Sequence, residues 1–207
     1  MGPRLLEGLA SVDWGSLRHA HGSADDVPEL LRALASSDEK RRTAAVKELF
    51  GNIWHQGTVY SATAAAVPFL YELLSGTDVT TRADIAGLLA SIAAGNGYLE
   101  IHAVGQFRET WRSILAKKGK SLDEEIVREK AETLEIRRAA GARLLDLVPY
   151  LRDPESENRL AVAEALGCYP YHRERTLPAL RSAASSETDE EVSEAIAKSI
   201  DRLEGVA

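Results

Sequence analysis

The sequence predicts an all-α protein built as a right-handed α-solenoid of about four to five helical hairpins, with an irregular helical insertion. Three observations predict this class. A short proline motif recurs along the chain, apolar residues after each copy follow helical spacing, and the composition favours helix. Ala and Leu dominate, β-branched runs are scarce, and only 6% of residues are aromatic. All 207 residues are expected to form a single domain, 1–207.

The recurring motif is a branched apolar residue followed by proline at the start of a short apolar run. An acidic residue follows each copy, and after three of these acids an Arg stands four positions further on. The four copies begin at Val27-Pro28, Val67-Pro68, Val148-Pro149 and Leu177-Pro178. The acid and Arg pairs are Asp38 with Arg42, Asp78 with Arg82, and Glu155 with Arg159. The last copy keeps the acid, Asp189, but has Ser193 in place of the Arg.

A second helix is predicted after each acidic residue, which lies in a polar turn that can cap this helix. In the second copy, the apolar residues stand at positions i, i+3, i+4 and i+7, namely Ile85, Leu88, Leu89 and Ile92. This spacing forms one stripe per helix. Neither helix of a pair can bury its stripe alone, so stacked pairs must cover each other. The repeats are therefore placed near residues 25–56, 60–95, 138–169 and 174–204.

Residues 96–137 lack the proline motif and form the predicted insertion. A short amphipathic helix is expected from apolar residues at helical spacing, namely Phe107, Trp111, Ile114 and Leu115. A longer helix follows, with Val127, Ala131 and Leu134 on one face, and we expect it to run on into the third proline motif at Val148-Pro149. The insertion is either a solvated helix held by ion pairs or a protruding element that helps to clamp a partner.

The repeated pairs resemble HEAT repeats of the kind found in many bacterial proteins, over residues 25–95 and 138–204. The stretches 12–17 and 52–60 also resemble a group of bacterial HEAT-repeat-containing proteins that have no assigned activity. This resemblance implies a protein-binding scaffold that uses the concave face of its stacked second helices. The implication is an analogy between folds and identifies no partner.

The charge balance and the absence of targeting signals narrow the classes of function. The chain has 25 basic and 32 acidic residues, a net charge of −7, which argues against binding to a phosphate backbone. No stretch approaches the roughly 20 apolar residues of a membrane span, and Met1–Leu9 lacks the apolar run of a signal peptide. The only cysteine, Cys168, cannot form an intramolecular disulfide. A cytoplasmic protein without membrane contact is expected.

The candidate partner surface consists of Trp54, His55, Gln56 and Tyr60, between two helical pairs, together with Trp111 in the insertion. Trp and Tyr are enriched at binding hot spots because they bury a large area at a low cost in side-chain entropy. The alternative is that Trp54 and Tyr60 pack the junction between repeats, while His55 and Gln56 satisfy carbonyl groups at helix ends. Both interpretations stay open at this point.

No catalytic residue, metal site or cofactor is predicted. His19 and His21 offer two metal ligands, but zinc sites need three or four, so a solvated loop is expected there. The paired His-Glu dipeptides of HEAT-like metal hydroxylases do not occur in this chain. Cys168 is expected to be an inert residue of an apolar helix.

The preferred function is therefore a non-catalytic scaffold that binds another protein through its concave face. One alternative is an immunity or antitoxin-like protein whose acidic surface masks a basic toxin. Another is a DNA-base glycosylase of the HEAT-like type, which would need a basic channel and a catalytic Asp beside exposed aromatic residues. The acidic charge balance weighs against this enzyme. The oligomeric state leaves no mark in the sequence.

Overall fold

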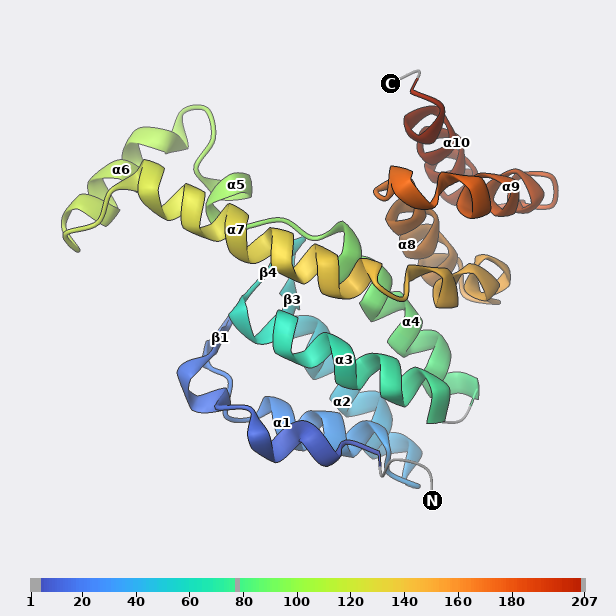
Figure 1. Ribbon diagram of the computed structural model, residues 1–207, viewed down its shortest axis with the longest axis horizontal. Coiled ribbons are helices and arrows are strands. Elements are labelled where there is room, and N and C mark those ends of the chain that lie inside the picture. Colours follow the sequence, from blue (N-terminus) through green and yellow to red (C-terminus); the bar gives the residue numbers. More distant parts are fainter. Residues whose placement is uncertain (1–4, 77–78, 206–207) are drawn as a thin grey trace.

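The computed structural model describes residues 5–76 and 79–205, and most of them are helical (Figure 1). The predicted helical class is confirmed. The longer helical elements are α1 (Val27–Leu34), α2 (Glu39–Asn52), α3 (Ser61–Gly76), α4 (Val79–Ala94), α5 (Tyr98–His102), α6 (Phe107–Ala116), α7 (Leu122–Gly141), the 3₁₀ helix η3 (Leu144–Arg152), α8 (Ser156–Gly167), α9 (Arg173–Ala184) and α10 (Glu190–Glu204). The shorter elements are the 3₁₀ turns η1 (Glu7–Ser11), η2 (Trp14–Ser16) and η4 (Pro170–His172), and the strands β1 (Arg18–His19), β2 (Gly22–Ser23), β3 (Trp54–His55) and β4 (Thr58–Val59).

The helices pack in pairs, and the pairs stack along the chain (Figure 1). Within the pairs, α1 contacts α2, α3 contacts α4, η3 contacts α8, and α9 contacts α10. The second members form one row, in which α2 contacts α4, α4 contacts α8, and α8 contacts α10. Helix α7 lies across α3 and α4 and joins the two halves of the stack.

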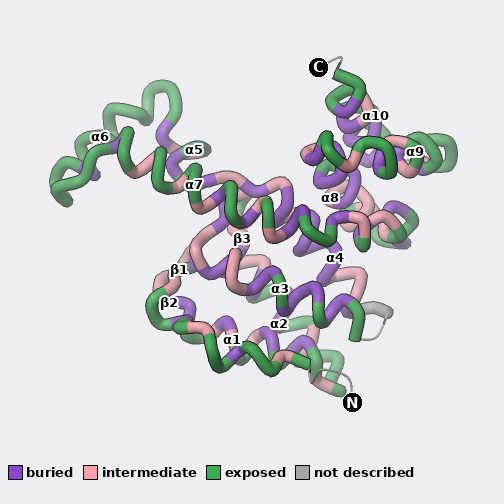
Figure 2. The backbone as a smooth tube through the Cα atoms, viewed as in Figure 1, coloured by how far each residue is buried: buried purple, intermediate pink, exposed green. Residues whose placement is uncertain are grey.

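One hydrophobic core runs through the whole stack, and Figure 2 shows the buried backbone along its interior. Its centre is α4, where the predicted stripe of Ile85, Leu88, Leu89 and Ile92 is fully buried. No residue between 81 and 94 is exposed, because α2, α3, α7 and α8 all pack against this helix. Among the described residues, no helix combines the length and the apolar character needed to cross a bilayer.

The polar turns cap two of the second helices as predicted, whereas Glu155 makes no side-chain capping bond at the start of α8 in the described structure. The Asp38 carboxylate accepts the backbone N–H groups of Lys40 and Arg41 at the start of α2. The Asp189 carboxylate accepts the N–H of Val192 at the start of α10. Each bond satisfies an N–H group that has no partner inside its helix. The predicted cap Asp78 lies outside the described residues.

The Arg that follows the first cap links two neighbouring helical pairs. Arg42 donates through Nε to the hydroxyl of Thr81 on α4, at 2.8 Å. Another of its guanidinium nitrogens donates to the carbonyl oxygen of Ser36 in the turn before α2, at 2.9 Å. One side chain therefore ties its own turn to the next helical pair.

Arg159 makes the same kind of link one stage further along the stack. Its guanidinium group forms a two-point ion pair with the Glu187 carboxylate, with N–O distances of 2.8 and 2.9 Å. It also donates to the carbonyl oxygen of Asp153 in its own turn, at 2.8 Å. The Arg of the repeated motif thus has an equivalent role in the first and third copies.

The prolines affect their helices differently. Pro28 lies in the first turn of α1, where its missing N–H removes no helical bond. Pro68 lies inside α3, which continues through it. Pro149 instead belongs to η3, which is separate from α7 because the backbone breaks at Arg143. The predicted continuous helix from the insertion into the third proline motif is therefore wrong, because α7 ends at Gly141.

Residues 98–134 form an arm that extends away from the stack (Figure 1). The arm contains α5, α6 and the first part of α7, and it has a small core of its own. This core consists of Leu99, Ala103, Leu115 and Leu122, with Trp111 and Ile126 packed against it. The insertion is therefore an ordered protrusion with local packing and not a solvated helix alone.

The arm carries most of the exposed large apolar side chains in the described part of the chain. They are Tyr98, Val104, Phe107, Val127 and Leu134, whereas only Leu5 and Tyr171 lie elsewhere. Val127, Ala131 and Leu134 share one face of α7 as predicted, but this face is open to solvent. The buried face of α7 is formed by other residues, Leu122, Thr133, Ile136 and Ala140 among them.

Helices α8 and α10 approach closely at Gly167. A Cβ atom at this position would lie 2.6 Å from the Cβ of Ser199 and 2.9 Å from its Cα. The Ser199 hydroxyl donates to the carbonyl oxygen of Ala163, at 2.9 Å. The absence of a side chain at Gly167 therefore sets the distance between the last two second helices.

Candidate binding groove

The segment singled out in the sequence forms a β-hairpin between the first two helical pairs. Trp54–His55 pairs with Thr58–Val59 in antiparallel register. The two turn residues, Gln56 and Gly57, have positive φ angles of 50° and 85°. This combination is typical of a two-residue type I′ turn, which favours glycine at such positions. The Gln-Gly pair before a β-branched dipeptide was the available signal for this hairpin.

The residues of the hairpin face different surroundings. Trp54 is half-buried against the main core, and its ring meets that of Phe50 edge-on at 5.9 Å. The indole N–H of Trp54 is buried without a hydrogen-bond partner among the described residues. The half-buried ring of His55 lies 5.5 Å from that of His21, and Gln56 is exposed at the turn. Trp54 therefore contributes mainly to packing.

His19 belongs to a buried polar network, so the expected solvated loop is wrong for this residue. The side chain is 6% exposed, and Nδ1 accepts the backbone N–H of His21 at 3.0 Å. Nε2 therefore carries the proton and donates to Asp26, also at 3.0 Å. The second carboxylate oxygen of Asp26 accepts the Asn52 amide at 2.7 Å. This network connects the hairpin β1–β2 to α1 and α2.

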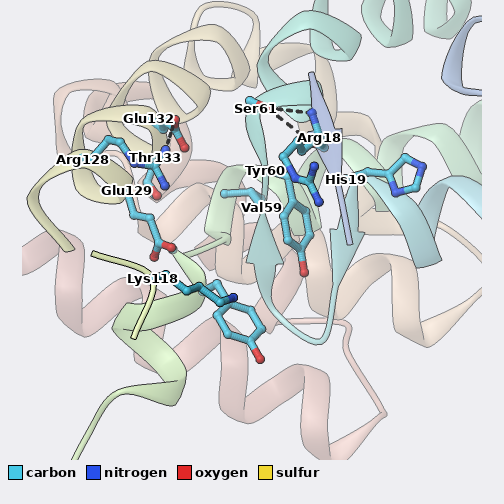
Figure 3. Close-up of a pocket in the computed structure, with 12 residues that line it drawn as sticks. Arg18, His19, Val59, Tyr60, Ser61, Lys118, Arg128, Glu129, Glu132 and Thr133 are labelled. Carbon is cyan, nitrogen blue, oxygen red and sulfur yellow. Dashed lines mark hydrogen bonds and ion pairs between the residues drawn. The ribbon is translucent and has the colours of Figure 1, made fainter. Parts of the chain in front are cut away.

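An open groove of about 390 Å³ lies between the stack and the arm (Figure 3). Its wall on the side of the stack includes Arg18 of β1 and Tyr60, which follows β4. On the side of the arm it includes residues from α5, from the turn after α6 and from α7, among them Tyr98, Lys118, Glu129 and Glu132. We call this feature the groove.

Two tyrosines provide the aromatic surface of the groove. The Tyr60 hydroxyl lies 2.6 Å from that of Thr58, which donates its own proton to the carbonyl of His55. Tyr60 is therefore the donor, and its oxygen can accept a further bond; burial raises its pKa. Tyr98 is partly exposed and meets the ring of Trp111 edge-on at 5.4 Å. Trp111 thus supports the groove through Tyr98, without lining it.

The charged groups of the groove are unevenly paired. Glu129 is half-buried and accepts the backbone N–H of Leu99 at 2.7 Å, and burial raises the pKa of its carboxyl group. Arg128 pairs instead with Glu125 and Glu132. No cation hydrogen-bonds to Glu129 within the described residues, so this carboxylate can accept a donor from a ligand.

The groove also contains two cationic side chains that are free to bind a ligand. The guanidinium group of Arg18 and the ammonium group of Lys118 are exposed. Neither group forms a hydrogen bond or an ion pair with the part of the chain that is described. Both can therefore bind an external carboxylate without first breaking an internal contact.

The groove combines residues that the sequence predicted with residues that it did not indicate. Of the predicted residues, only Tyr60 lines it. Arg18, Tyr98, Lys118 and Glu129 come from four separate segments, and no local motif marks them. The turn signal at Gly95 to Gly97, just before Tyr98, was the single hint that the chain changes direction there.

No family model matches the chain, and no curated protein matches it significantly. The function must therefore be inferred from the chemistry of the groove and the arrangement of the helices.

Proposed function

We propose that this protein is a non-catalytic scaffold that binds another protein, with the groove as a principal part of its binding surface. In this proposal the helical pairs form a right-handed α-solenoid of about four to five HEAT-like repeats. The equivalent contacts of Arg42 and Arg159 support the repeat assignment, since each links its own turn to the next pair. The continuous row of second helices also supports it.

The observation that carries the proposal is the meeting of Tyr60, Tyr98 and Arg18 in one open groove. Tyr and Arg are the residues most often enriched at the energetic centres of protein interfaces. Tyrosine offers apolar area and a hydroxyl group with few rotatable bonds, so little entropy is lost when it binds. In the groove Arg18 and Tyr60 lie beside the packed helices of the stack, and Tyr98 is supported by the ring of Trp111 in the arm.

The charges of the groove define the chemistry of the partner segment. An acidic side chain or a C-terminal carboxylate would bind Arg18 and Lys118, which have no internal side-chain partners in the described structure. A Lys, Arg or amide donor would bind the half-buried carboxylate of Glu129. A segment with both kinds of group fits better than a nucleic acid, whose phosphates would meet the carboxylates of Glu129 and Glu132.

The test compares capture of partners from native cells by three variants. Arg18→Glu reverses a free cation of the groove, and Tyr98→Ala removes aromatic surface. Lys47→Glu makes the same charge change as Arg18→Glu on the exposed side of α2 and serves as the matched control. Captured proteins are quantified by mass spectrometry, and each variant is checked by circular dichroism and thermal unfolding.

We expect a specific protein whose recovery falls about tenfold or more with both groove variants and stays unchanged with the control. Tenfold corresponds to about 1.4 kcal/mol, which is a usual loss at an interface hot spot. Calorimetry with the purified partner would then confirm direct binding. Equal recovery with all variants would refute the groove as the binding surface. Loss only with Lys47→Glu would assign binding to the row of second helices, where the concave face was predicted.

The immunity-protein alternative has no specific observation in its favour, since the free cations of the groove suit an acidic partner group better than a basic toxin. The glycosylase alternative needs a catalytic Asp beside exposed aromatic residues. The described lining of the groove contains no Asp. The scaffold function is therefore the one that we put forward.

A further inference from the structure

The exposed face of α7 has an apolar strip at helical spacing. Val127 is 69% exposed and Leu134 is 49% exposed, with exposed Ala131 between them. Positions i, i+4 and i+7 lie on one side of a helix, so the three side chains form a continuous strip. Because α7 uses other residues to pack on the arm and the stack, the strip is not needed for folding.

The same face carries opposite charges at its two ends. Glu124 continues the strip toward the N-terminal end of α7, and Arg138 continues it toward the C-terminal end. Both side chains are exposed. Glu124 has no ion-pair partner in the described structure, and Arg138 pairs only with Glu135 one turn away on the surface. The order along the face is therefore acid, apolar strip, base.

We infer that α7 is a self-association surface, on which the strip packs antiparallel against the α7 strip of a second copy of this chain. A two-fold axis near Ala131 places Val127 against Leu134 of the partner subunit, and Leu134 against Val127 of the partner subunit. The same axis places Glu124 beside Arg138 of the partner subunit. A parallel arrangement would instead set acid against acid and base against base. The pattern is therefore self-complementary in one orientation, as a two-fold interface requires.

The dimensions of the strip agree with a close helix contact. From Glu124 to Arg138 the helix spans roughly 21 Å, at about 1.5 Å per residue. Ala131 at the centre lets two backbones approach within about 8–10 Å. A contact of one helix from each copy is small compared with stable dimer interfaces, so the dissociation constant of the dimer is expected to be micromolar or higher.

Dimerisation through this face leaves the groove open. Glu129 and Glu132 line the groove, and their positions on α7 turn away from the strip. The dimer would present two grooves, so a partner with two matching segments would bind more tightly than one with a single segment. The self-association does not depend on the proposed function and can be tested without any partner.

The test is sedimentation velocity of the full chain from about 1 to 500 μM at low ionic strength. The wild type is expected to show a reversible monomer–dimer equilibrium. Val127→Glu should raise the dissociation constant at least tenfold, because it places a charge in the apolar contact. The control is Phe107→Glu, which changes a similarly exposed apolar residue on α6 and should leave the equilibrium unchanged. Circular dichroism checks that every variant remains folded.

The orientation is tested by charge reversal. Glu124→Arg and Arg138→Glu should each weaken the dimer several-fold, and the two together should restore it, because the pair is then re-formed with opposite signs. A wild-type chain that stays monomeric up to 500 μM would overturn the inference. Equal effects of Val127→Glu and Phe107→Glu would also overturn it. Failure of the double reversal to recover association would rule out the antiparallel pairing.

Discussion

The ion pair between Arg159 and Glu187 should control the stability of the last helical pair in a pH-dependent way. The two side chains are only 15% and 5% exposed, and two parallel N–O contacts of 2.8 and 2.9 Å join them. Glu187 also accepts the backbone N–H groups of Thr188 and Asp189. Chiefly through the bond from Arg159, its pKa falls from an ordinary value of 4.5 to about 2.

This shift gives the size of the effect. A difference of about 2.5 pH units corresponds to at most about 3.5 kcal/mol of folding free energy, at about 1.4 kcal/mol per unit, and solvent screening of this pair near the surface reduces the expected effect to about 2–3 kcal/mol. The pKa is lower in the folded state, so this contribution is fully present above the unfolded value near 4.5. It is lost as the pH falls toward 2. Replacement by Gln removes the charge, and with it the pH dependence of this site.

The measurement is urea unfolding of wild type and Glu187→Gln, followed by circular dichroism from pH 7 to pH 2.5. At pH 7 the variant should be less stable by about 2–3 kcal/mol, and the difference should shrink steadily below pH 4.5. The control, Glu194→Gln, removes an exposed carboxylate that pairs with Lys198 on α10, and both its effect at pH 7 and the change of that effect with pH should be much smaller, because solvent screens an exposed pair. A difference that is constant with pH, or too small to measure at pH 7, would refute the reasoning.

Two further substitutions test packing. Gly167→Ala should cost about 1–3 kcal/mol and lower the melting temperature, because the new methyl group collides with the backbone of Ser199 on α10. The control is Gly51→Ala, whose new methyl group meets no atom within 4 Å. It should be neutral or stabilising by up to about 1 kcal/mol. Equal melting temperatures for the two variants would contradict the close approach of α8 and α10. Trp54→Phe should change the unfolding free energy by less than about 1 kcal/mol, because the loss of part of the ring area is offset by the removal of a buried N–H without a partner. Trp54→Ala removes the whole ring system and should cost about 2 kcal/mol or more. Chemical unfolding distinguishes the two Trp54 variants, and an unchanged stability of Trp54→Ala would show that the indole contributes no packing.

Local features of the fold were predictable from the sequence because they depend on neighbouring residues. The carboxylates of Asp38 and Asp189 act on N–H groups two or three positions away. The stripe of α4 likewise follows from helical spacing within one element. The break between α7 and η3 was not predicted. Proline lacks an N–H and its ring crowds the carbonyl four residues earlier, which favoured a short 3₁₀ segment around Pro149 over a longer α-helix.

The groove depends on contacts between distant segments, and for that reason the sequence revealed only Tyr60. Arg18 and Glu129 are separated by more than half of the chain, yet both line the same cavity. Trp54 and Trp111 were selected as large aromatic residues, but residue type alone does not tell whether an indole faces the core or the solvent. Their positions became clear only from the rings of Phe50 and Tyr98 that they contact.

The complete covering of α4 has a consequence for cooperativity. In a simple array each repeat touches only its neighbours, and the ends can unravel one unit at a time. Here α7 packs against both α3 and α4, and α8 also packs against α4. Opening α4 would therefore disrupt both halves of the molecule at once. Its backbone amides should exchange with deuterium only through global unfolding, whereas those at the end of the arm exchange through small local openings.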